Sequence, residues 1–502
     1  MDYQKLQNGS DIRGVAMEGV AGQPVNLTDE AMERIGRAFT VYLQKKLGKD
    51  KLTLAVGRDS RLSGERLLNA FAAGAAAQGA DVTDVGLSST PSMFMCTVTE
   101  GWRCDGAAML TASHLPFNRN GVKLFTAGGG FEKADIAAVL ALAAAGDFPS
   151  ATTPGKRTSA DFLSVYAGGL REIIKSGVNG ADREHPLTGF HIVVDAGNGA
   201  GGFYAHRVLA PLGADVSGSQ FLEPDGRFPN HAPNPEDPAA MDAIRDCVLK
   251  NRADLGLIFD TDVDRAGAVS ADGTEINRNR LIALISAVVL KEHPGTTIVT
   301  DSITSSGLAA FIAEKGGVHH RFKRGYRNVI NESIRLNGLG QDSQLAIETS
   351  GHGALMENYF LDDGAYLVTK LVIEMARLKR EGRTLMSLID TLTEPLESTE
   401  VRMNLFGADF AAVGTEILKG LTGYAESQGW DVAKENYEGI RVSFPAGEGD
   451  GWFLLRMSLH DPLMPLNIES NSPGGVKSIA GKLYAFLKAC PGLDCEGLKA
   501  LA

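Results

Sequence analysis

The chain has 502 residues, of which 44% are hydrophobic and 22% are charged, and its formal net charge is −12 at pH 7. This composition is that of a globular protein, and at about 150 residues per domain the length predicts three or four domains. The acidic balance, without a local cluster of basic residues, argues against a nucleic-acid-binding protein.

The first residues, MDYQKLQNGSDIRG, lack the basic stretch and apolar core of a secretory signal. The longest apolar run, residues 281–290, has about half the length of a membrane span and predicts a buried helix instead. Five cysteines without a CxxC pair predict neither a disulfide framework nor a structural zinc site. We therefore expect a cytoplasmic protein without a membrane partner.

Short apolar runs alternate with helical patterns through the first three quarters of the chain. Residues 51–57 predict a strand, residues 63–79 a helix and residues 81–86 a second strand. Strand and helix patterns return at residues 190–218, 253–265 and 296–317, with residues 204–213 as the helix of the first of these stretches. Glycines at the joints are typical of α/β layers, so the sequence predicts three α/β units.

The last quarter of the chain has a different pattern. Residues 439–470 predict a meander of strands, and residues 474–490 predict a closing helix, which together indicate an α+β domain. Polar, proline-containing stretches mark the boundaries between domains. The predicted domains are residues 1–155, 156–277, 278–395 and 396–502.

The first candidate site is the stretch TASHLPFNRNGVK, residues 111–123, which follows an apolar run. A serine is a weak nucleophile, so Ser113 must be activated or already modified, and a polar loop after a strand lets its hydroxyl meet a substrate. The side chain of Lys123, two residues after Gly121, would lie back toward the serine and act on a phosphate or a sugar hydroxyl. An N-cap or turn serine is the alternative.

The second candidate site is LGLIFDTDVDRAG, in which Asp260, Asp262 and Asp264 follow an apolar strand at every second position. Crowded carboxylates repel one another unless a cation neutralises them, and oxygen ligands select Mg²⁺ or Ca²⁺. An EF-hand is excluded because its glycine and glutamate positions hold Arg265 and Ala271.

The same stretch also matches the DxDx(T/V) motif of aspartyl-phosphate enzymes of the haloacid-dehalogenase type. In that alternative Asp260 is the nucleophile. It leaves the loop of Ser113 without a role.

The third candidate site is LAIETSGHGAL, where Glu348, Ser350 and His352 alternate and share one side if the segment is extended. A Glu and Ser pair is suited to two hydroxyls of a sugar. A polar turn is the alternative.

The fourth candidate site is LLRMSLHDP, which presents Arg456, Ser458 and His460 at alternate positions. This spacing suits the oxygens of a phosphate. A basic face of a strand is the alternative.

Three arginines near the N-terminus lie in polar loops. Arg13, in GSDIRG, is a candidate to hold the reacting phosphate. Arg58 and Arg61, in VGRDSRLSG, are of the kind that holds loops together through ion pairs.

Taken together and in this order, these stretches resemble the α-D-phosphohexomutases, the family of phosphomannomutases and phosphoglucomutases. That family has a phosphoserine in a TASHNP loop, an Mg²⁺-binding DxDxDR loop, a GExSGH-like loop for the sugar hydroxyls and an RxSxTEP-like loop for the substrate phosphate. The resemblance covers almost the whole chain. It implies three related α/β domains with mixed sheets and a smaller C-terminal α+β domain around a central cleft.

By this resemblance the enzyme donates a phosphate from Ser113 to a hexose 1-phosphate and passes through a 1,6-bisphosphate. The implied catalytic residues are Ser113, His114, Lys123, Arg13, Arg265 and His352. The implied substrate-binding residues are Glu348, Ser350, Arg456, Ser458, His460, Tyr326 and Arg327. The implied Mg²⁺ ligands are Ser113, Asp260, Asp262 and Asp264. Lys123 and His352 would move protons, the partner would be a small sugar phosphate, and glucose 1,6-bisphosphate would act as activator.

The chain departs from the family pattern at several positions. Leu115 stands where the family usually has Asn, and His460 and Asp461 stand where Thr and Glu are usual. Tyr326 stands where some members have a histidine.

Three hypotheses therefore stay open: a phosphohexomutase, an aspartyl-phosphate phosphotransferase or phosphatase that uses Asp260, and a sugar-phosphate-binding protein without catalysis. Glucose, mannose and glucosamine phosphates are all open as substrates, since a Glu and Ser pair serves several epimers. The oligomeric state is open too.

Overall fold

The computed structural model describes residues 2–149, 151, 153–407, 409–458 and 461–502. The chain divides into two compact units. The first unit consists of Met1–Val288 with Ser350–Leu388, and the second of Val289–Thr349 with Ile389–Ala502. Each is described by itself. All five cysteines are free thiols, as the sequence predicted.

The first unit begins with a mixed sheet of strand order β1-β2-β6-β5-β3-β4-β8, in which β7 also pairs with β6. Its strands are β1 (Gln7–Asn8), β2 (Asp11–Val15), β3 (Thr53–Arg58), β4 (Asp81–Leu87), β5 (Gly106–Leu110), β6 (Arg119–Thr126), β7 (Gly129–Gly130) and β8 (Arg157–Ser159). Strand β3 runs parallel to β4 and β5, whereas β6 is antiparallel to β5 and β2. The loop of Ser113 is thus the connection between two neighbouring antiparallel strands.

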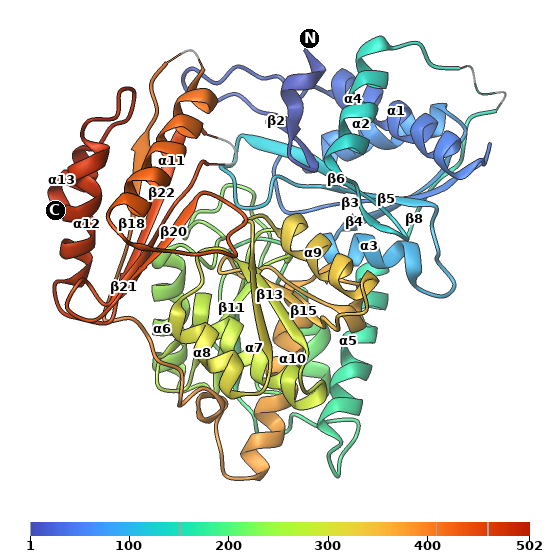
Figure 1. Ribbon diagram of the computed structural model, residues 1–502. Helices are drawn as coiled ribbons and strands as arrows, with labels where there is room; N and C mark the ends of the chain where they lie inside the picture. Colours follow the sequence, from blue (N-terminus) through green and yellow to red (C-terminus); the bar gives the residue numbers. More distant parts are fainter. Residues whose placement is uncertain (1, 150, 152, 408, 459–460) are drawn as a thin grey trace. The chain divides into compact units, whose positions relative to one another are not determined.

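Helices cover both faces of this sheet. They are α1 (Asp29–Leu47), α2 (Gly64–Ala77), α3 (Thr90–Val98) and α4 (Lys133–Ala145), preceded by the short η1 (Tyr3–Leu6). Figure 1 shows α1, α2 and α4 on one face and α3 on the other. The larger group packs on the strands through one apolar core, to which α1 contributes Ile35 and Phe39.

Local signals explain where α1 begins and ends. The hydroxyl of Thr28 accepts a hydrogen bond from the backbone N–H of Ala31 at 3.2 Å, which satisfies a donor of the first turn. At the other end, Gly48 has φ 64°, the left-handed conformation that commonly terminates a helix. Ile35, Phe39 and Leu43 recur every four residues and are fully buried, as expected for one face of an amphipathic helix.

The second sheet of the first unit has the order β12-β11-β10-β9. Its strands are β9 (Ile192–Asp195), β10 (Leu255–Phe259), β11 (Ala266–Ser270) and β12 (Glu275–Ile276). Strands β9 and β10 are parallel, and β10 and β11 are antiparallel, so this sheet is also mixed. The aspartate loop connects β10 to β11.

The first unit contains further helices and a short pair of strands. They are α5 (Phe162–Val178), α6 (Pro238–Asn251), α10 (Gly364–Arg380), the antiparallel pair β16 (Gly353–Leu355) and β17 (Leu361–Asp362), and the short η4 (Met356–Asn358) and η5 (Leu385–Leu388). The helix predicted at residues 204–213 is confirmed as helical, with Tyr204–Leu209 (η2) a π-helix and Ala210–Leu212 (η3) a 3₁₀-helix rather than one α-helix. Pro211 has no backbone N–H to continue an α-helical ladder.

Helix α7 (Arg278–Glu292) contains the apolar run at residues 281–290. Leu281, Ile282, Ala283, Leu284 and Ile285 are all fully buried, which confirms the prediction of a buried helix. Of the helices in the described part of the chain, none combines the length and the apolar composition of a membrane span.

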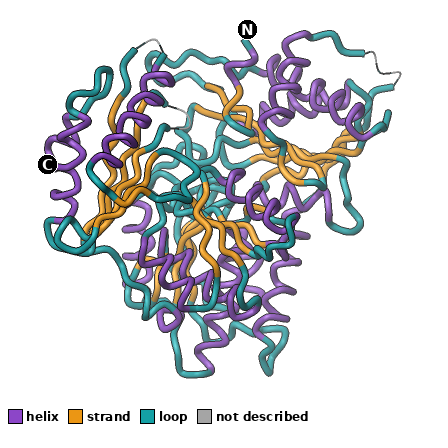
Figure 2. The backbone as a smooth tube through the Cα atoms, in the orientation of Figure 1, coloured by secondary structure: helices purple, strands orange, loops and turns teal. Residues whose placement is uncertain are grey.

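The second unit contains a parallel and an antiparallel layer, both visible as strand bundles in Figure 2. The parallel layer has β13 (Thr297–Asp301) between β14 (Val318–Phe322) and β15 (Leu345–Ile347), with helices α8 (Ser306–Glu314) and α9 (Tyr326–Gly338). These elements make the third α/β layer that the sequence predicted.

The antiparallel layer has the strand order β18-β22-β21-β20-β19. Its elements are β18 (Glu397–Asn404), β19 (Asp431–Val432), β20 (Ile440–Phe444), β21 (Gly451–Leu455), β22 (Leu463–Ser470), α11 (Phe410–Ser427), α12 (Gly475–Leu487) and α13 (Glu496–Leu501). The predicted meander and closing helix are confirmed, and the apolar faces of α11, α12 and α13 share one core with the strands. The fold is therefore three α/β layers and a smaller C-terminal α+β layer.

A buried carboxyl in this last layer predicts a pH-dependent stability. Burial raises the pKa of Glu469 to about 7, although the charge of Arg441 and a hydrogen bond from Nε1 of Trp452 at 2.9 Å act in the opposite direction. Because its pKa in the unfolded chain is lower, at 4.5, the protonated form stabilises the fold. That contribution is complete below pH 4.5 and is lost as the pH rises through about 7.

The variant Glu469→Gln keeps an acceptor for Trp452 and cannot ionise. The free energy of unfolding of this variant, relative to that of the wild type, should be higher at about pH 8 than at about pH 5, by up to about 3 kcal/mol. Urea unfolding at the two pH values measures the difference. A constant difference between the two proteins would contradict the prediction.

Candidate active site

The aspartate loop after β10 is buried and fixed by three neighbouring segments. The backbone carbonyls of residues 261, 262 and 263 accept hydrogen bonds from the N–H groups of Ala200 at 2.8 Å, Thr90 at 2.8 Å and Gly364 at 3.0 Å, respectively. A Cβ atom at Gly364 would lie 2.9 Å from the carbonyl oxygen of Val263, so only glycine lets α10 approach this closely. Val263 has φ 67°, a strained conformation for a β-branched residue, which these contacts sustain.

The three carboxylates of this loop form one cluster. Oxygen atoms of Asp260, Asp262 and Asp264 lie within 4.8 Å of one another, and all three residues are fully buried. Burial and the neighbouring carboxylates raise the pKa of Asp260 and of Asp262. Burial acts in the same direction on Asp264, but the charges of Lys123, His352 and Arg265 outweigh it and lower the pKa of Asp264.

This cluster fits a divalent cation. The Oδ1 atoms of Asp262 and Asp264 are buried, and neither accepts a hydrogen bond from any of the described residues. Buried carboxylate oxygens without a donor cost several kcal/mol unless a cation meets them, and hard oxygen donors favour Mg²⁺.

Ser113 lies directly against the aspartate loop. Its hydroxyl donates to Oδ2 of Asp260 at 3.2 Å and accepts a hydrogen bond from Nη2 of Arg265 at 2.9 Å. Ser113 has φ 52°, and its backbone N–H is held by the hydroxyl of Thr111 at 2.9 Å. A serine in a strained, fixed turn therefore presents its oxygen to a carboxylate and a guanidinium at once.

Two further cations balance the carboxylates. Nε of Arg265 lies 3.1 Å from Asp260, and its Nη1 donates to the side chain of Asn234 at 3.1 Å. The ammonium of Lys123 donates to Asp264 and lies 3.9 Å from Asp262. The sequence predictions for Lys123 and Arg265 thus converge on the same cluster.

His114 accepts a hydrogen bond at Nδ1 from Arg265. The residue as a whole is exposed, but burial of this edge of the ring, with the charges of Arg265 and Arg13, lowers the pKa of His114. The imidazole is therefore neutral near pH 7. Arg13 itself pairs with Asp11 at 2.8 Å.

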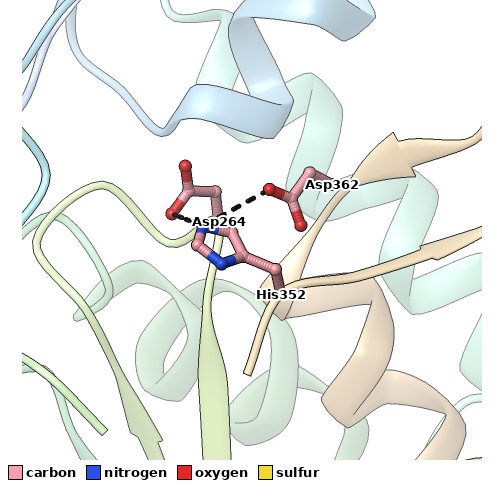
Figure 3. Close-up of side chains that lie close together, drawn as sticks. All are labelled: Asp264, His352 and Asp362. Atoms are coloured by element: carbon pink, nitrogen blue, oxygen red, sulfur yellow. Dashed lines mark ion pairs between the residues drawn. The ribbon is translucent and has the colours of Figure 1, made fainter. Parts of the chain in front are cut away.

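His352 enters the cluster from the side of β16, as Figure 3 shows. Its Nε2 lies 3.7 Å from Asp264 and 3.5 Å from Asp362, so the imidazole stands between two carboxylates. Its Nδ1 is hydrogen-bonded to the hydroxyl of Ser350 at 2.8 Å. The segment is not extended, since residues 349–350 form a turn and Gly351 has φ 91°.

Arg61, which the sequence indicated only as a loop-holding residue, is the anchor of the serine loop. Its guanidinium donates to the backbone carbonyls of Ser113, Leu115 (2.6 Å), Pro116 (2.8 Å) and Arg119 (3.0 Å). Its Nε lies 3.3 Å from the buried Asp59. The loop therefore uses the carbonyl, and not the side chain, of Leu115 to hold its shape.

The other predicted residues form a separate group in the second unit. Glu348 accepts a hydrogen bond from the backbone N–H of Gly325 at 2.6 Å, in the loop that leads into α9. Tyr326 and Arg327 are the first two residues of that helix. Ser350, by contrast, belongs to the first unit together with His352.

Arg456 is buried in this second group. Burial and the nearby charge of Arg324 lower the pKa of Arg456. Arg324, which the sequence analysis did not single out, pairs with Asp301 at 3.2 Å. Ser458 continues from Arg456 in the β21–β22 hairpin, through a backbone hydrogen bond to residue 463 at 2.9 Å. His460 lies outside the described residues.

Several functional contacts were missed in the sequence. Thr90 donates its hydroxyl to Asp262 at 2.5 Å, and Glu236 lies 3.6 Å from Arg265. The stretch EPDGRFPNHAPNP, residues 223–235, also resembles a stretch of the phosphohexomutases and is the available signal for Asn234. For Thr90 the sequence offers no signal beyond a helix cap.

Comparison with known proteins gives a consistent result. Models of phosphoglucomutase/phosphomannomutase alpha/beta/alpha domains I, II and III match residues 4–150, 166–273 and 277–396. A phosphomannomutase/phosphoglucomutase of Pseudomonas aeruginosa is 31% identical over 484 residues, 96% of each chain.

Two solved structures are similar along nearly the whole chain. A phosphoglucomutase/phosphomannomutase family protein from Burkholderia thailandensis has a TM-score of 0.80 at 30% identity, covering 98% of this chain and 99% of that one. An N-acetylphosphoglucosamine mutase from Aspergillus fumigatus, in complex with GlcNAc-6P and magnesium, has a TM-score of 0.54 at 13% identity. It covers 91% of this chain and 96% of that one, and shares the fold.

The anchoring of the serine loop is testable through stability. Arg61→Met leaves Asp59 buried without its partner and four carbonyls without a donor, which should cost about 3–5 kcal/mol of unfolding free energy. The double variant Asp59→Asn with Arg61→Met should lose less, since it removes the uncompensated charge. Urea unfolding of the three proteins checks this, and a loss below about 1 kcal/mol in Arg61→Met would contradict it.

Proposed function

The chain belongs to the phosphoglucomutase/phosphomannomutase family, and from this we propose that it interconverts hexose 1-phosphate and hexose 6-phosphate of glucose, mannose or both. It is an intramolecular phosphotransferase of the isomerase class. The reaction passes through a phosphoserine enzyme and a 1,6-bisphosphate. The observation that carries the proposal is the position of the Ser113 hydroxyl between Asp260 and Arg265, at 3.2 and 2.9 Å.

The same observation disfavours Asp260 as a nucleophile. Its Oδ2 atom accepts hydrogen bonds from both Ser113 and Arg265, so the oxygen that would attack a phosphorus is already engaged. Ser113 stands on the outer side of that carboxylate, in a loop fixed by Arg61. A purely binding protein would have no use for a strained serine in this position.

The residues that would hold Mg²⁺ are Asp260, Asp262, Asp264 and, through its phosphate, Ser113. When bound, the ion withdraws charge from the phosphoryl oxygens and so eases transfer. The buried Oδ1 atoms of Asp262 and Asp264 support this assignment.

The transfer itself depends mainly on positioning and on charge. The bond from phosphorus to Oγ of Ser113 breaks while a bond to a substrate hydroxyl oxygen forms, and the hydroxyl proton must leave. Arg265 and Arg13 stabilise the transferring group, with the neutral His114 beside it. After the bisphosphate turns over, its other phosphoryl group returns to Ser113 and the isomer is released.

Lys123 and His352 are proposed to move protons to and from the reacting hydroxyl: the imidazole of His352 would accept the proton that leaves, and the ammonium of Lys123 would donate one to the departing oxygen. Lys123 donates to Asp264, and His352 is oriented by the hydroxyl of Ser350. Both approach the aspartate cluster from segments other than the serine loop.

Recognition of the sugar phosphate is assigned to the second group of residues. Glu348, with Ser350, would bind sugar hydroxyls, and Arg456, Ser458 and His460 would bind the phosphate that does not react. Tyr326 and Arg327 would contribute to the same site. The burial of Arg456 supports its role, since a desolvated guanidinium attracts a phosphate strongly.

We also propose the four-domain division at residues 1–155, 156–277, 278–395 and 396–502, a cytoplasmic location, and a hexose 1,6-bisphosphate such as glucose 1,6-bisphosphate as activator. Three free buried cysteines are consistent with a reducing compartment.

Ser113 should carry phosphate in the purified enzyme. Intact-mass and peptide analysis should find a phosphate on Ser113 that survives mild acid and is eliminated by alkali. Ser113→Ala should lose both this phosphate and turnover of glucose 1-phosphate, whereas Ser164→Ala, an exposed helix serine, should keep both. A hydroxylamine-labile phosphate on Asp260 would support the aspartyl-phosphate alternative instead.

Turnover should require Mg²⁺. Chelation should abolish activity and lower the melting temperature, because the three carboxylates then repel one another without a cation. Asp262→Asn should raise the Mg²⁺ concentration needed for half-maximal activity by on the order of tenfold or more. Asp246→Asn, at an exposed carboxylate, serves as the control and should change neither quantity. Full activity in excess chelator would rule out the metal.

A further inference from the structure

The second unit contains a cavity of about 290 Å³ between strands β14 and β20, close in size to the smallest sites for organic ligands. Its lining is polar: Arg321 and His319 come from β14, Arg441 from β20, Ser306 from the start of α8, and the exposed Glu435 is the one carboxylate among the lining residues described. Tyr437 forms part of its mouth and is 40% exposed. None of these residues has a role in the proposed reaction.

The two arginines converge at the base of this cavity. Nε of Arg321 and Nη2 of Arg441 both donate to the backbone carbonyl of Thr304, at 3.2 and 3.3 Å. Arg321 also donates to the carbonyl of Ser305 at 2.7 Å, and Arg441 to that of Ser302 at 2.9 Å. Two like charges are therefore held close together by neutral carbonyls.

Arg441 is buried and Arg321 half-buried, whereas two fully buried arginines of the first unit have carboxylate partners. Arg61 pairs with Asp59 at 3.3 Å, and Arg265 pairs with Asp260 at 3.1 Å. Within the described chain, no carboxylate forms an ion pair with Arg321 or Arg441. A buried charge without a counter-ion is costly, so this pair has an unmet demand for an anion.

The acidic groups nearby do not satisfy that demand. Glu469 interacts with both guanidiniums only at longer range. Its carboxylate also accepts a hydrogen bond from the indole N–H of Trp452 at 2.9 Å. The plane of the Arg441 guanidinium lies over the Trp452 ring, 3.5 Å from its centroid, which fixes the group without neutralising it. The guanidiniums are thus preorganised for a ligand that enters from the cavity.

We propose that this cavity is an anion-binding site that takes the phosphate group of a small molecule, separate from the substrate phosphate site at Arg456. Guanidinium groups bind phosphate oxygens with several directed hydrogen bonds, and a convergent pair suits a tetrahedral dianion. The rings of Phe322 and Tyr437, with centroids 4.8 Å apart, line the wall next to the arginines and leave room for the organic part of a phosphomonoester.

The position of the anion is tested in crystals of the full chain soaked with tungstate, a tetrahedral dianion with strong anomalous scattering. We expect an anomalous peak in contact with Arg321 and Arg441, whether or not a second peak appears at Arg456. Peaks at Arg456 or elsewhere, without one between Arg321 and Arg441, would overturn the proposal.

Solution binding provides the second test, with inorganic phosphate as the probe in calorimetric titrations. The background variant Arg456→Gln weakens the proposed substrate site, so that the remaining binding reports the cavity. Adding Ser306→Asp places a negative charge on an exposed residue of the lining and should weaken phosphate binding by about tenfold.

The matched control is Ala310→Asp, which adds the same charge to an exposed position of α8 outside the lining. It should change the affinity by less than about twofold. Equal affinities for the Ser306→Asp and Ala310→Asp proteins would show that phosphate does not occupy the cavity. Adenosine 5′-monophosphate in place of phosphate then separates the two ligand sources: tighter binding indicates a phosphomonoester, and equal binding indicates the free ion.

Discussion

The burial of three carboxylates on one short loop is the constraint on which the rest of the first unit depends. Asp260, Asp262 and Asp264 lie at the end of a fully buried strand, where each negative charge is costly. The fold meets this cost with one cation from a distant part of the chain, Lys123 on β6, and one at the end of the loop itself, Arg265. Even so, Asp262 and Asp264 each keep a buried oxygen that accepts no hydrogen bond from the described residues, and a divalent ion is the simplest group that completes the balance.

The same constraint explains why the neighbouring backbone is strained and held so firmly. Val263 and Ser113 both have positive φ values, which would relax if the loops were free. The aspartate loop is held by backbone donors from three segments, and four carbonyls of the serine loop are held by one guanidinium, that of Arg61. Two rigid loops therefore bring a hydroxyl and a cluster of carboxylates together at hydrogen-bond distance, the kind of positioning on which phosphoryl transfer depends.

The sequence allowed the elements and the four motifs to be predicted, because strand periodicity and local spacing are properties of neighbouring residues. It did not reveal the partners, since Thr90 and Asp262 are 172 positions apart and meet only through the packing of α3 against the loop. The side chains of residues 348–352 do not alternate as in an extended strand, because the chain turns at Gly351. The sequence indicated that Arg61 holds loops together, but it did not indicate which loop. The acceptors of Arg61 are backbone carbonyls, which have no side-chain pattern in the sequence.

The two units handle buried positive charge in different ways, and the difference indicates their chemistry. In the first unit, Arg61 and Arg265 each have a carboxylate partner, so their charges serve the internal structure and the reacting group. In the second unit, Arg321, Arg441 and Arg456 are held by carbonyls and ring faces, and no described carboxylate pairs with them. A desolvated guanidinium without a counter-ion contributes little to stability, but it binds an incoming anion strongly because no internal carboxylate must first be displaced. The second unit is therefore built to receive anions, whereas the first is built to transfer one.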